Sequence, residues 1–160
     1  MTSLERAFDW MSVEKLIASY LRIASDDLRE ANILFDAKGR NSVYLAEQAA
    51  EQIILAIAQS EEVHFGRDHN HQLDRMLVRL PDENPFKAAL QSIAWLEAYA
   101  TTYKYPRASG AIIRPPESEK LKSALDELER ILLRLAEHFG VDLTPGSERP
   151  AARTHPARKV

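Results

Sequence analysis

The sequence contains no cysteine and little glycine, and each absence excludes a class of structure. Without cysteine the chain can form no disulfide, no thiolate metal site and no cysteine nucleophile, which suits the reducing cytoplasm. Five glycines among 160 residues are too few for a protein built from strands and tight turns. We therefore expect a helical protein that works in the cytoplasm.

Long apolar runs and a leader-like N-terminus are missing as well. The longest unbroken apolar run covers residues 53–58, far too short to cross a bilayer. The N-terminus lacks a basic segment followed by an apolar core, so we expect no signal peptide and no contact with a membrane. The net charge of −3 does not attract nucleic acid through bulk electrostatics.

The sequence does contain five segments with apolar residues at helical spacing, separated by capping residues, glycine and proline. Ser12 is the predicted cap of the first helix, which ends near Ala37, with Gly39 as the left-handed residue that follows. The other helices are predicted over residues 41–59, 71–79, 85–103 and 117–139. Four long helices and one additional short helix predict an all-α fold, an antiparallel up-and-down four-helix bundle.

The composition changes near residue 142, which divides the chain into two parts. We expect the helical bundle domain over residues 1–142. From Thr144 on, four basic residues stand against one acidic residue, among prolines and small residues. We therefore predict a disordered, basic tail over residues 143–160, which is either simply solvated or touches RNA or an acidic partner.

The helix predicted over residues 41–59 is apolar on most of its circumference and still carries a row of polar side chains. Its polar arc holds Glu47, Gln48, Glu51, Gln52 and Gln59. A helix that is apolar nearly all round is normally buried, and buried polar groups need partners. We predict that Gln48 and Glu51 pair with His71 or Tyr105 and line a ligand cleft. A structural hydrogen-bond network, or a plain exposed face, explains the same pattern.

Three short motifs in a fixed order resemble those of a known family. They are YLAEQAAEQIILAI at residues 44–57, His71-Gln72-Leu73 before the third helix, and Lys104-Tyr105-Pro106 after the fourth. Together they are similar to the Tyr-x-x-Ala…Gln-Ala-x-Glu, His-Asp-Leu and Arg-Tyr-Pro motifs of HEPN domains, over roughly residues 13–140. Gln72 replaces an aspartate, Lys104 replaces an arginine, and Leu55 stands where a lysine that can hold phosphate is common.

This resemblance implies a small all-α bundle, usually a homodimer. It also implies nucleotide binding, a nucleotidyltransferase partner, or RNA cleavage as a toxin. Cleaving members carry Arg-x(4–6)-His, in which the histidine takes the proton of a ribose 2′-hydroxyl and the arginine neutralises the developing charge. Three residues separate Arg67 from His71, and three separate Arg134 from His138, which is one residue fewer than the motif requires. The pair Arg149 and His155 lies in the predicted tail. The cleavage motif is therefore not found, which argues against an enzyme.

An aromatic and basic cluster follows the fourth predicted helix. Its tyrosines can stack on a base while lysine and arginine hold phosphate, although Tyr99 and Tyr103 can instead complete the core. Combined with the polar row, this cluster completes the predicted ligand-binding set: Gln48, Glu51, His71, Tyr103, Lys104, Tyr105 and Arg107.

The loop before the third helix contains the other candidate chemistry. His64, His69 and His71 lie near Glu62 and Asp68 and offer imidazole and carboxylate ligands for zinc or nickel. The histidines lack the i,i+4 spacing of a helical metal site, and Asp68 suits a turn. We therefore predict no metal site and no cofactor.

Three hypotheses for function follow. The first is a HEPN-type nucleotide-binding or interaction module that works with a nucleotidyltransferase or in a toxin–antitoxin pair. The second is a metal-independent ribonuclease toxin that places Arg67 and His71 across a dimer interface. The third is a structural dimerisation module with an isologous interface made by the first and last helices.

Overall fold

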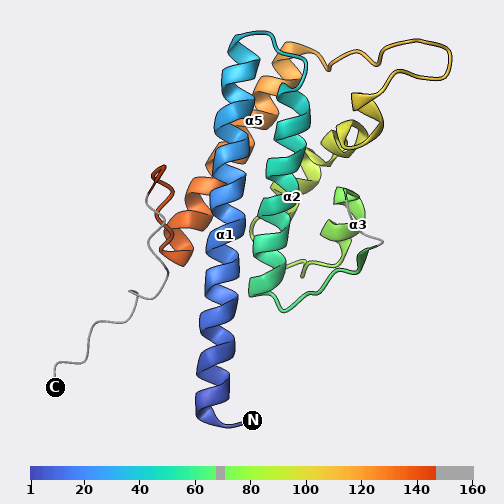
Figure 1. Ribbon diagram of the computed structural model, residues 1–160. Coiled ribbons are helices and arrows are strands. Elements are labelled where there is room, and N and C mark those ends of the chain that lie inside the picture. The colour runs from blue at the N-terminus through green and yellow to red at the C-terminus, as the bar shows by residue number, and fades with distance from the viewer. Residues whose placement is uncertain (68–70, 147–160) are drawn as a thin grey trace.

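The computed structural model describes residues 1–67 and 71–146 of the chain. Within these ranges all regular secondary structure is helical, as the sequence predicts. The elements are α1 (Ser3–Asp36), α2 (Ser42–Ser60), α3 (Leu73–Val78), α4 (Lys87–Ser92), the 3₁₀ segments η2 (Ala94–Tyr99) and η3 (Thr102–Lys104), and α5 (Ser118–Phe139). None of the helices in the described part of the chain is long and apolar enough to cross a membrane. Figure 1 shows α1, α2 and α5 side by side.

The first helix begins ten residues earlier than predicted. The Thr2 hydroxyl accepts a hydrogen bond from the Glu5 amide at 3.1 Å, and the Glu5 carboxylate accepts one from the Thr2 amide at 2.6 Å. This capping box satisfies two amides that a helix start otherwise leaves free. Ser12, the predicted cap, therefore lies inside α1, and the first turns of the helix extend beyond the end of α2 (Figure 1).

The end of α1 also differs from the prediction in one residue. Lys38, and not Gly39, has the left-handed backbone, with φ 57°. Gly39 is required for another reason: a Cβ at this position would lie 3.1–3.2 Å from atoms of Leu34. The Gly39 amide donates to the Leu34 carbonyl at 2.6 Å, so the chain turns tightly against the last helical turn before α2 begins.

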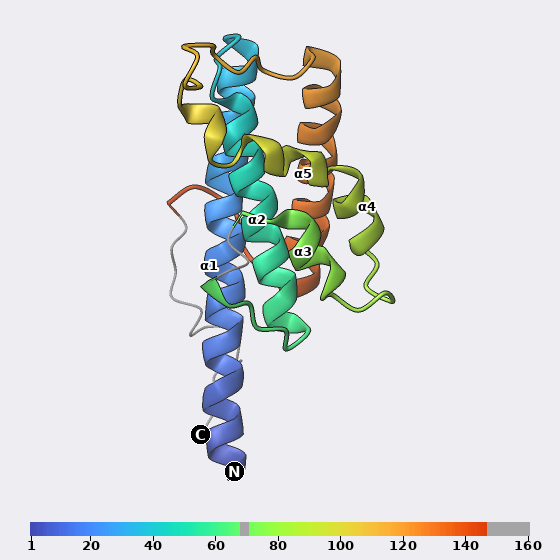
Figure 2. The ribbon, with the colours of Figure 1, turned by 90° about the vertical axis from the view of Figure 1, so that its right-hand side faces the viewer.

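The second helix forms as predicted and lies at the centre of the core. Val43, Ala46, Ala49, Ile53 and Ala56 are all 0% exposed. Figures 1 and 2 show α2 between α1 on one side and the segment from α3 to η2 on the other. The small alanine side chains leave room for close approach of the neighbouring helices, and the isoleucines fill the space between them.

The fourth helix predicted over residues 85–103 does not form as one helix. It is divided into α4, η2 and η3, with breaks at Ile93 and at residues 100–101. The buried side chains of this stretch recur every three residues, at Leu90, Ile93 and Leu96. This spacing matches the three residues per turn of a 3₁₀ helix better than the 3.6 residues per turn of an α-helix. The chain still runs up, down, up and down (Figure 2), but this third pass is broken, so the predicted four-helix bundle is not confirmed.

The last helix matches its predicted range. Gly140 closes α5 in the left-handed conformation, with φ 64°, and the Val141 amide donates to the Ala136 carbonyl at 2.8 Å. The tail is predicted over residues 143–160. Its part from residue 147 on lies outside the described residues.

The buried alanine face of α2 gives a test of this packing. Replacing Ala50, which is 1% exposed, with phenylalanine should lower the free energy of unfolding by about 1–3 kcal/mol because the added ring overfills a closed space. Urea unfolding of the parent and of the exposed Ala88→Phe control measures the difference. Equal stability of Ala50→Phe and the parent would show that this face of α2 is not packed.

Candidate functional site

Two carboxylates from α2 are withdrawn from solvent where the helix faces α3. Glu47 is 0% exposed and Glu51 is 8% exposed. They are four residues apart, so they project from the same side of the helix. Figures 1 and 2 show α3 against the second half of α2. Carboxylates are almost never fully buried without partners, so the groups around them define the site.

His71 reaches Glu51 from the start of α3, as the sequence predicts. Its Nδ1 lies 2.8 Å from Glu51 Oε2, and its backbone amide donates to Glu51 Oε1 at 3.4 Å. The Nδ1 contact lacks hydrogen-bond geometry, so this nitrogen has no hydrogen-bond partner among the described residues. His71 also has a positive φ of 62°, which is unusual for a residue with a side chain and costs on the order of 1–3 kcal/mol.

Glu47 is the residue of the site that the sequence prediction missed. Its Oε2 accepts a hydrogen bond from Gln48 Nε2 at 2.6 Å, whereas its Oε1 has no partner among the described residues. Burial raises the pKa of Glu47 to about 8, against the lowering effect of the Gln48 hydrogen bond, and the carboxylates of Glu51, Glu97 and Asp27 raise it further. The side chain is therefore protonated at neutral pH when no cation is bound.

Further acidic groups surround this pair. Burial raises the pKa of Asp27 on α1 to about 6, and the neighbouring Glu30 and Asp26 add to the shift. Glu97 on η2 contributes to the potential at Glu47 and accepts a hydrogen bond from the Asp74 amide at 3.1 Å. We call Asp27, Glu47, Glu51 and Glu97 the acidic centre, because three separate segments supply carboxylates to one region.

In the described part of the chain, two carboxylates of the acidic centre and one of the predicted histidines supply the possible metal ligands. Glu47, Glu51 and His71 each offer one ligand atom, and these atoms lie within 4.8 Å of one another. His64 is exposed and does not join this group among the described residues, while His69 and Asp68 lie outside them. Of the predicted metal candidates, only His71 is therefore placed beside other potential ligands.

The aromatic and basic cluster divides into a buried and an exposed part. Tyr103 is 0% exposed, and its hydroxyl donates to the Arg40 carbonyl at 2.8 Å. The Arg40 guanidinium lies 3.9 Å from the centre of the Tyr103 ring and donates to the carbonyls of Tyr103 and Ile113. Tyr103 therefore fastens the connector to the core, which leaves Lys104, Tyr105 and Arg107 as the exposed members.

Lys104 connects this cluster to the polar side of α2. Its Nζ lies 3.8 Å from the centre of the Tyr44 ring. Tyr44 and Glu51 are seven residues apart, which is about two turns and ~10 Å along the helix. The cluster and His71 thus lie near two points along α2, with Gln48 between them. No hydrogen bond or ion pair in the described part of the chain joins Tyr105 or Arg107 to Gln48, Glu51 or His71.

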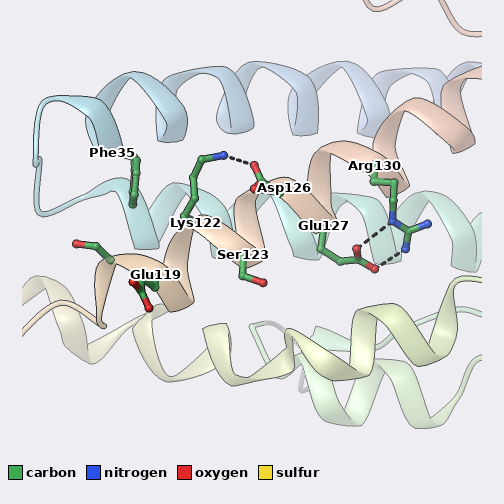
Figure 3. Close-up of a pocket in the computed structure, with 8 residues that line it drawn as sticks. Phe35, Glu119, Lys122, Ser123, Asp126, Glu127 and Arg130 are labelled. Atoms are coloured by element: carbon green, nitrogen blue, oxygen red, sulfur yellow. Dashed lines mark hydrogen bonds and ion pairs between the residues drawn. The ribbon is translucent and has the colours of Figure 1, made fainter.

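Two hollows on the described surface lie away from these residues. The larger one, about 640 Å³, opens along α5, and Figure 3 shows its charged side chains. Lys122 pairs there with Asp126, and Arg130 pairs with Glu127, so these charges are already compensated. A second hollow of about 430 Å³ is lined by Arg134 and His138 among other residues. The Arg134 guanidinium stacks over Phe86 at 5.1 Å.

The raised pKa of Asp27 predicts how stability depends on pH. The folded protein binds the proton of Asp27 more tightly than the unfolded chain, whose ordinary pKa is 3.8, so this group lowers the free energy of unfolding as pH rises from about 4 to about 6. Asp27→Asn should therefore stabilise the protein above pH 6, by about 1 kcal/mol after solvent screening, and change little below pH 4.

Urea unfolding of the parent and of Asp27→Asn across this pH range measures the effect. Asp9→Asn, at an exposed position of the same helix, is the control. If the stability difference between the parent and Asp27→Asn does not change with pH, the raised pKa of Asp27 would be contradicted.

Comparison with known proteins supports the resemblance seen in the motifs. The family model for the HEPN domain matches residues 17–138. The match begins at the buried Ile17 of α1 and ends in the last turn of α5. Comparisons with curated proteins and with solved structures found no match. The chain therefore belongs to the HEPN family, which indicates an all-helical module related to nucleotides or RNA.

Proposed function

We propose that this HEPN protein is a nucleotide-binding module that works beside a nucleotidyltransferase or within a toxin–antitoxin pair. The observation that carries the proposal is the arrangement along α2. Lys104 lies over Tyr44 at one point, and the half-exposed His71 lies against Glu51 about two turns further on. The lack of cysteine agrees with a cytoplasmic setting, which we propose with it.

The two parts of this surface suit the two ends of a nucleotide. Lys104 is exposed and Arg107 is exposed, so both can hold phosphate, while Tyr105 is 69% exposed and can stack on a base. The half-buried Gln48 and the imidazole of His71 offer polar groups to the sugar or to the edge of the base. Tyr103 takes no part in this binding surface, because its ring and hydroxyl are used inside the protein.

The ribonuclease alternative has less support in the described residues. Arg67 is exposed, and no ion pair or hydrogen bond joins it to His71 in the described ranges. His71 faces Glu51, which holds the imidazole but supplies no positive charge for a phosphorane. Arg134 and His138 line one hollow, but Arg134 stacks on Phe86 and the spacing is one residue shorter than the cleavage motif.

Nucleotide binding is tested by thermal unfolding with a panel of nucleoside mono- and triphosphates, with EDTA present so that free metal does not contribute. A true ligand at ~100 times its dissociation constant adds ~2.7 kcal/mol of stability. Lys104→Met keeps the alkyl stem and removes the charge, so it should weaken this stabilisation and leave the stability without nucleotide nearly unchanged.

Lys120→Met is the matched control for that experiment. Lys120 lies over an aromatic ring in the same way, with Nζ 4.2 Å from the centre of Trp95, but it belongs to α5. Its variant should respond to nucleotides as the parent does. If no nucleotide stabilises the parent, the protein is not a nucleotide-binding module. The proposal is then reduced to an interaction with a partner protein.

We also propose that the protein is a homodimer, which agrees with the third hypothesis of a dimerisation module. Several aliphatic side chains on α1 and α5 face solvent, among them Leu16 (40% exposed), Ile23 (47%) and Leu133 (58%). Because α1 and α5 pack side by side (Figure 1), one isologous interface can cover residues from both helices.

Light scattering at micromolar concentration should then give a dimer mass for the parent. Leu133→Lys should shift the protein toward the monomer, since it places a charge in the interface. Val78→Lys is the control, because Val78 is 73% exposed but lies on α3. A monomeric parent would contradict this part of the proposal.

A further inference from the structure

Three side chains converge between α2 and the start of α3 in a way that the packing of the bundle does not require. Glu47, Glu51 and His71 bring potential ligand atoms within 4.8 Å of one another, and two of these residues are buried. The histidine side chain is 38% exposed, so the group is open to solvent on the His71 side. An ion can therefore reach the site from the His71 side without unfolding of the helices.

Polar atoms at this place lack hydrogen-bond partners among the described residues. They are Glu47 Oε1 and His71 Nδ1. Buried polar atoms are satisfied in the great majority of cases, because each one left without a partner is destabilising. Glu47, at 0% exposure, carries its unpartnered oxygen within the group of three ligands. A bound cation would satisfy that oxygen.

The charge of the acidic centre favours the same conclusion. Glu47 and Glu51 lie close together, with Glu97 and Asp27 adding negative potential. No lysine or arginine forms an ion pair with these four residues in the described ranges, and His71 is the single basic group at ion-pair distance. A divalent cation would supply the compensating charge that no lysine or arginine of the described ranges supplies here.

The backbone at His71 holds the imidazole in position. The residue adopts φ 62°, and its amide donates to Glu51 Oε1, so one carboxylate fixes both the backbone and the ring of the same histidine. Strained backbone of this kind persists where the surrounding structure imposes it, and it is common at ligand sites. Gln48, which donates to Glu47 Oε2, orients the second carboxylate in the same manner as an outer partner of a metal ligand.

We propose that Glu47, Glu51 and His71 bind one divalent transition-metal ion. One imidazole and two carboxylates suit Zn²⁺, Mn²⁺ or Co²⁺, whereas Mg²⁺ and Ca²⁺ prefer sites made entirely of oxygen ligands. Three protein ligands leave further coordination positions for water. This proposal differs from the sequence-based expectation of no metal site. It shares His71 with the proposed nucleotide-binding surface, but no residue of the aromatic and basic cluster takes part, so metal binding can be tested without nucleotide.

The test uses the full chain without an affinity tag, stripped of metal with a chelator and then dialysed. Zn²⁺ is titrated by calorimetry, and Co²⁺ is titrated by visible absorption, both without nucleotide. We expect one ion per chain and a Co²⁺ spectrum that changes when imidazole coordinates. Glu47→Gln and His71→Asn should each weaken binding by about 10- to 100-fold or more. Asparagine is chosen because it tolerates positive φ.

Two control variants separate this site from other metal-binding groups. His64→Asn removes an exposed histidine of the same loop, and Glu129→Gln removes an exposed carboxylate of α5. Both should bind Zn²⁺ as the parent does. Thermal unfolding in chelator shows whether each variant folds. If Glu47→Gln does not fold, His71→Asn at its half-exposed position still decides the result.

Three outcomes would overturn the proposal. The first is a parent protein that binds neither Zn²⁺ nor Co²⁺. The second is binding that persists unchanged in His71→Asn and in a folded Glu47→Gln, which would place the ion elsewhere. The third is binding that His64→Asn weakens as much as His71→Asn does, which would assign the ion to the loop histidines.

Discussion

The burial of two carboxyl groups on one side of α2 is the constraint on which the rest of the structure depends. The helix is central, and most of its circumference packs against α1, α5 and η2, so Glu47 and Glu51 cannot turn away into water. The protein meets this constraint in two ways. Glu51 accepts a hydrogen bond from the His71 amide and lies at ion-pair distance from the His71 ring, while Glu47 is held by Gln48 on one oxygen and its other oxygen has no partner among the described residues. The chain before α3 adopts a strained backbone at His71 as part of this arrangement.

A second polar contact holds the connector at the other end of α2. The Arg40 guanidinium stacks on Tyr103 and donates to two carbonyls, and the Tyr103 hydroxyl returns a hydrogen bond to the Arg40 carbonyl. Arginine can do this because its planar group presents several donors in fixed directions. The result is that Lys104, the next residue, is fixed over Tyr44 on the polar side of α2. The acidic centre and this basic cluster therefore lie beside different parts of α2 and carry opposite charge.

Much of the fold follows from the sequence because local rules and packing agree. The ranges of α2 and α5 were predictable from apolar periodicity and from Gly140, and the HEPN motifs identified the family that the domain match confirms. The need of Glu51 for a partner was also predictable, since a buried carboxylate requires one, but the sequence left the choice open between His71 and Tyr105. The start of α1 was predicted wrongly because the capping box at Thr2 and Glu5 is as good a start as Ser12, and local sequence does not decide between two such starts.

Other features were decided by the tertiary structure alone. The sequence determined that residues 85–103 would bury one face, but their fit against α2 decided that the backbone follows three residues per turn over much of this stretch. The sequence placed Glu47 on a polar arc, where it looks exposed, and only the approach of neighbouring segments makes it the most buried acid in the described chain. Periodicity describes one helix by itself. Which side of that helix meets another element, and which oxygen is left without a partner, depends on segments distant in the sequence that come together only when the protein folds.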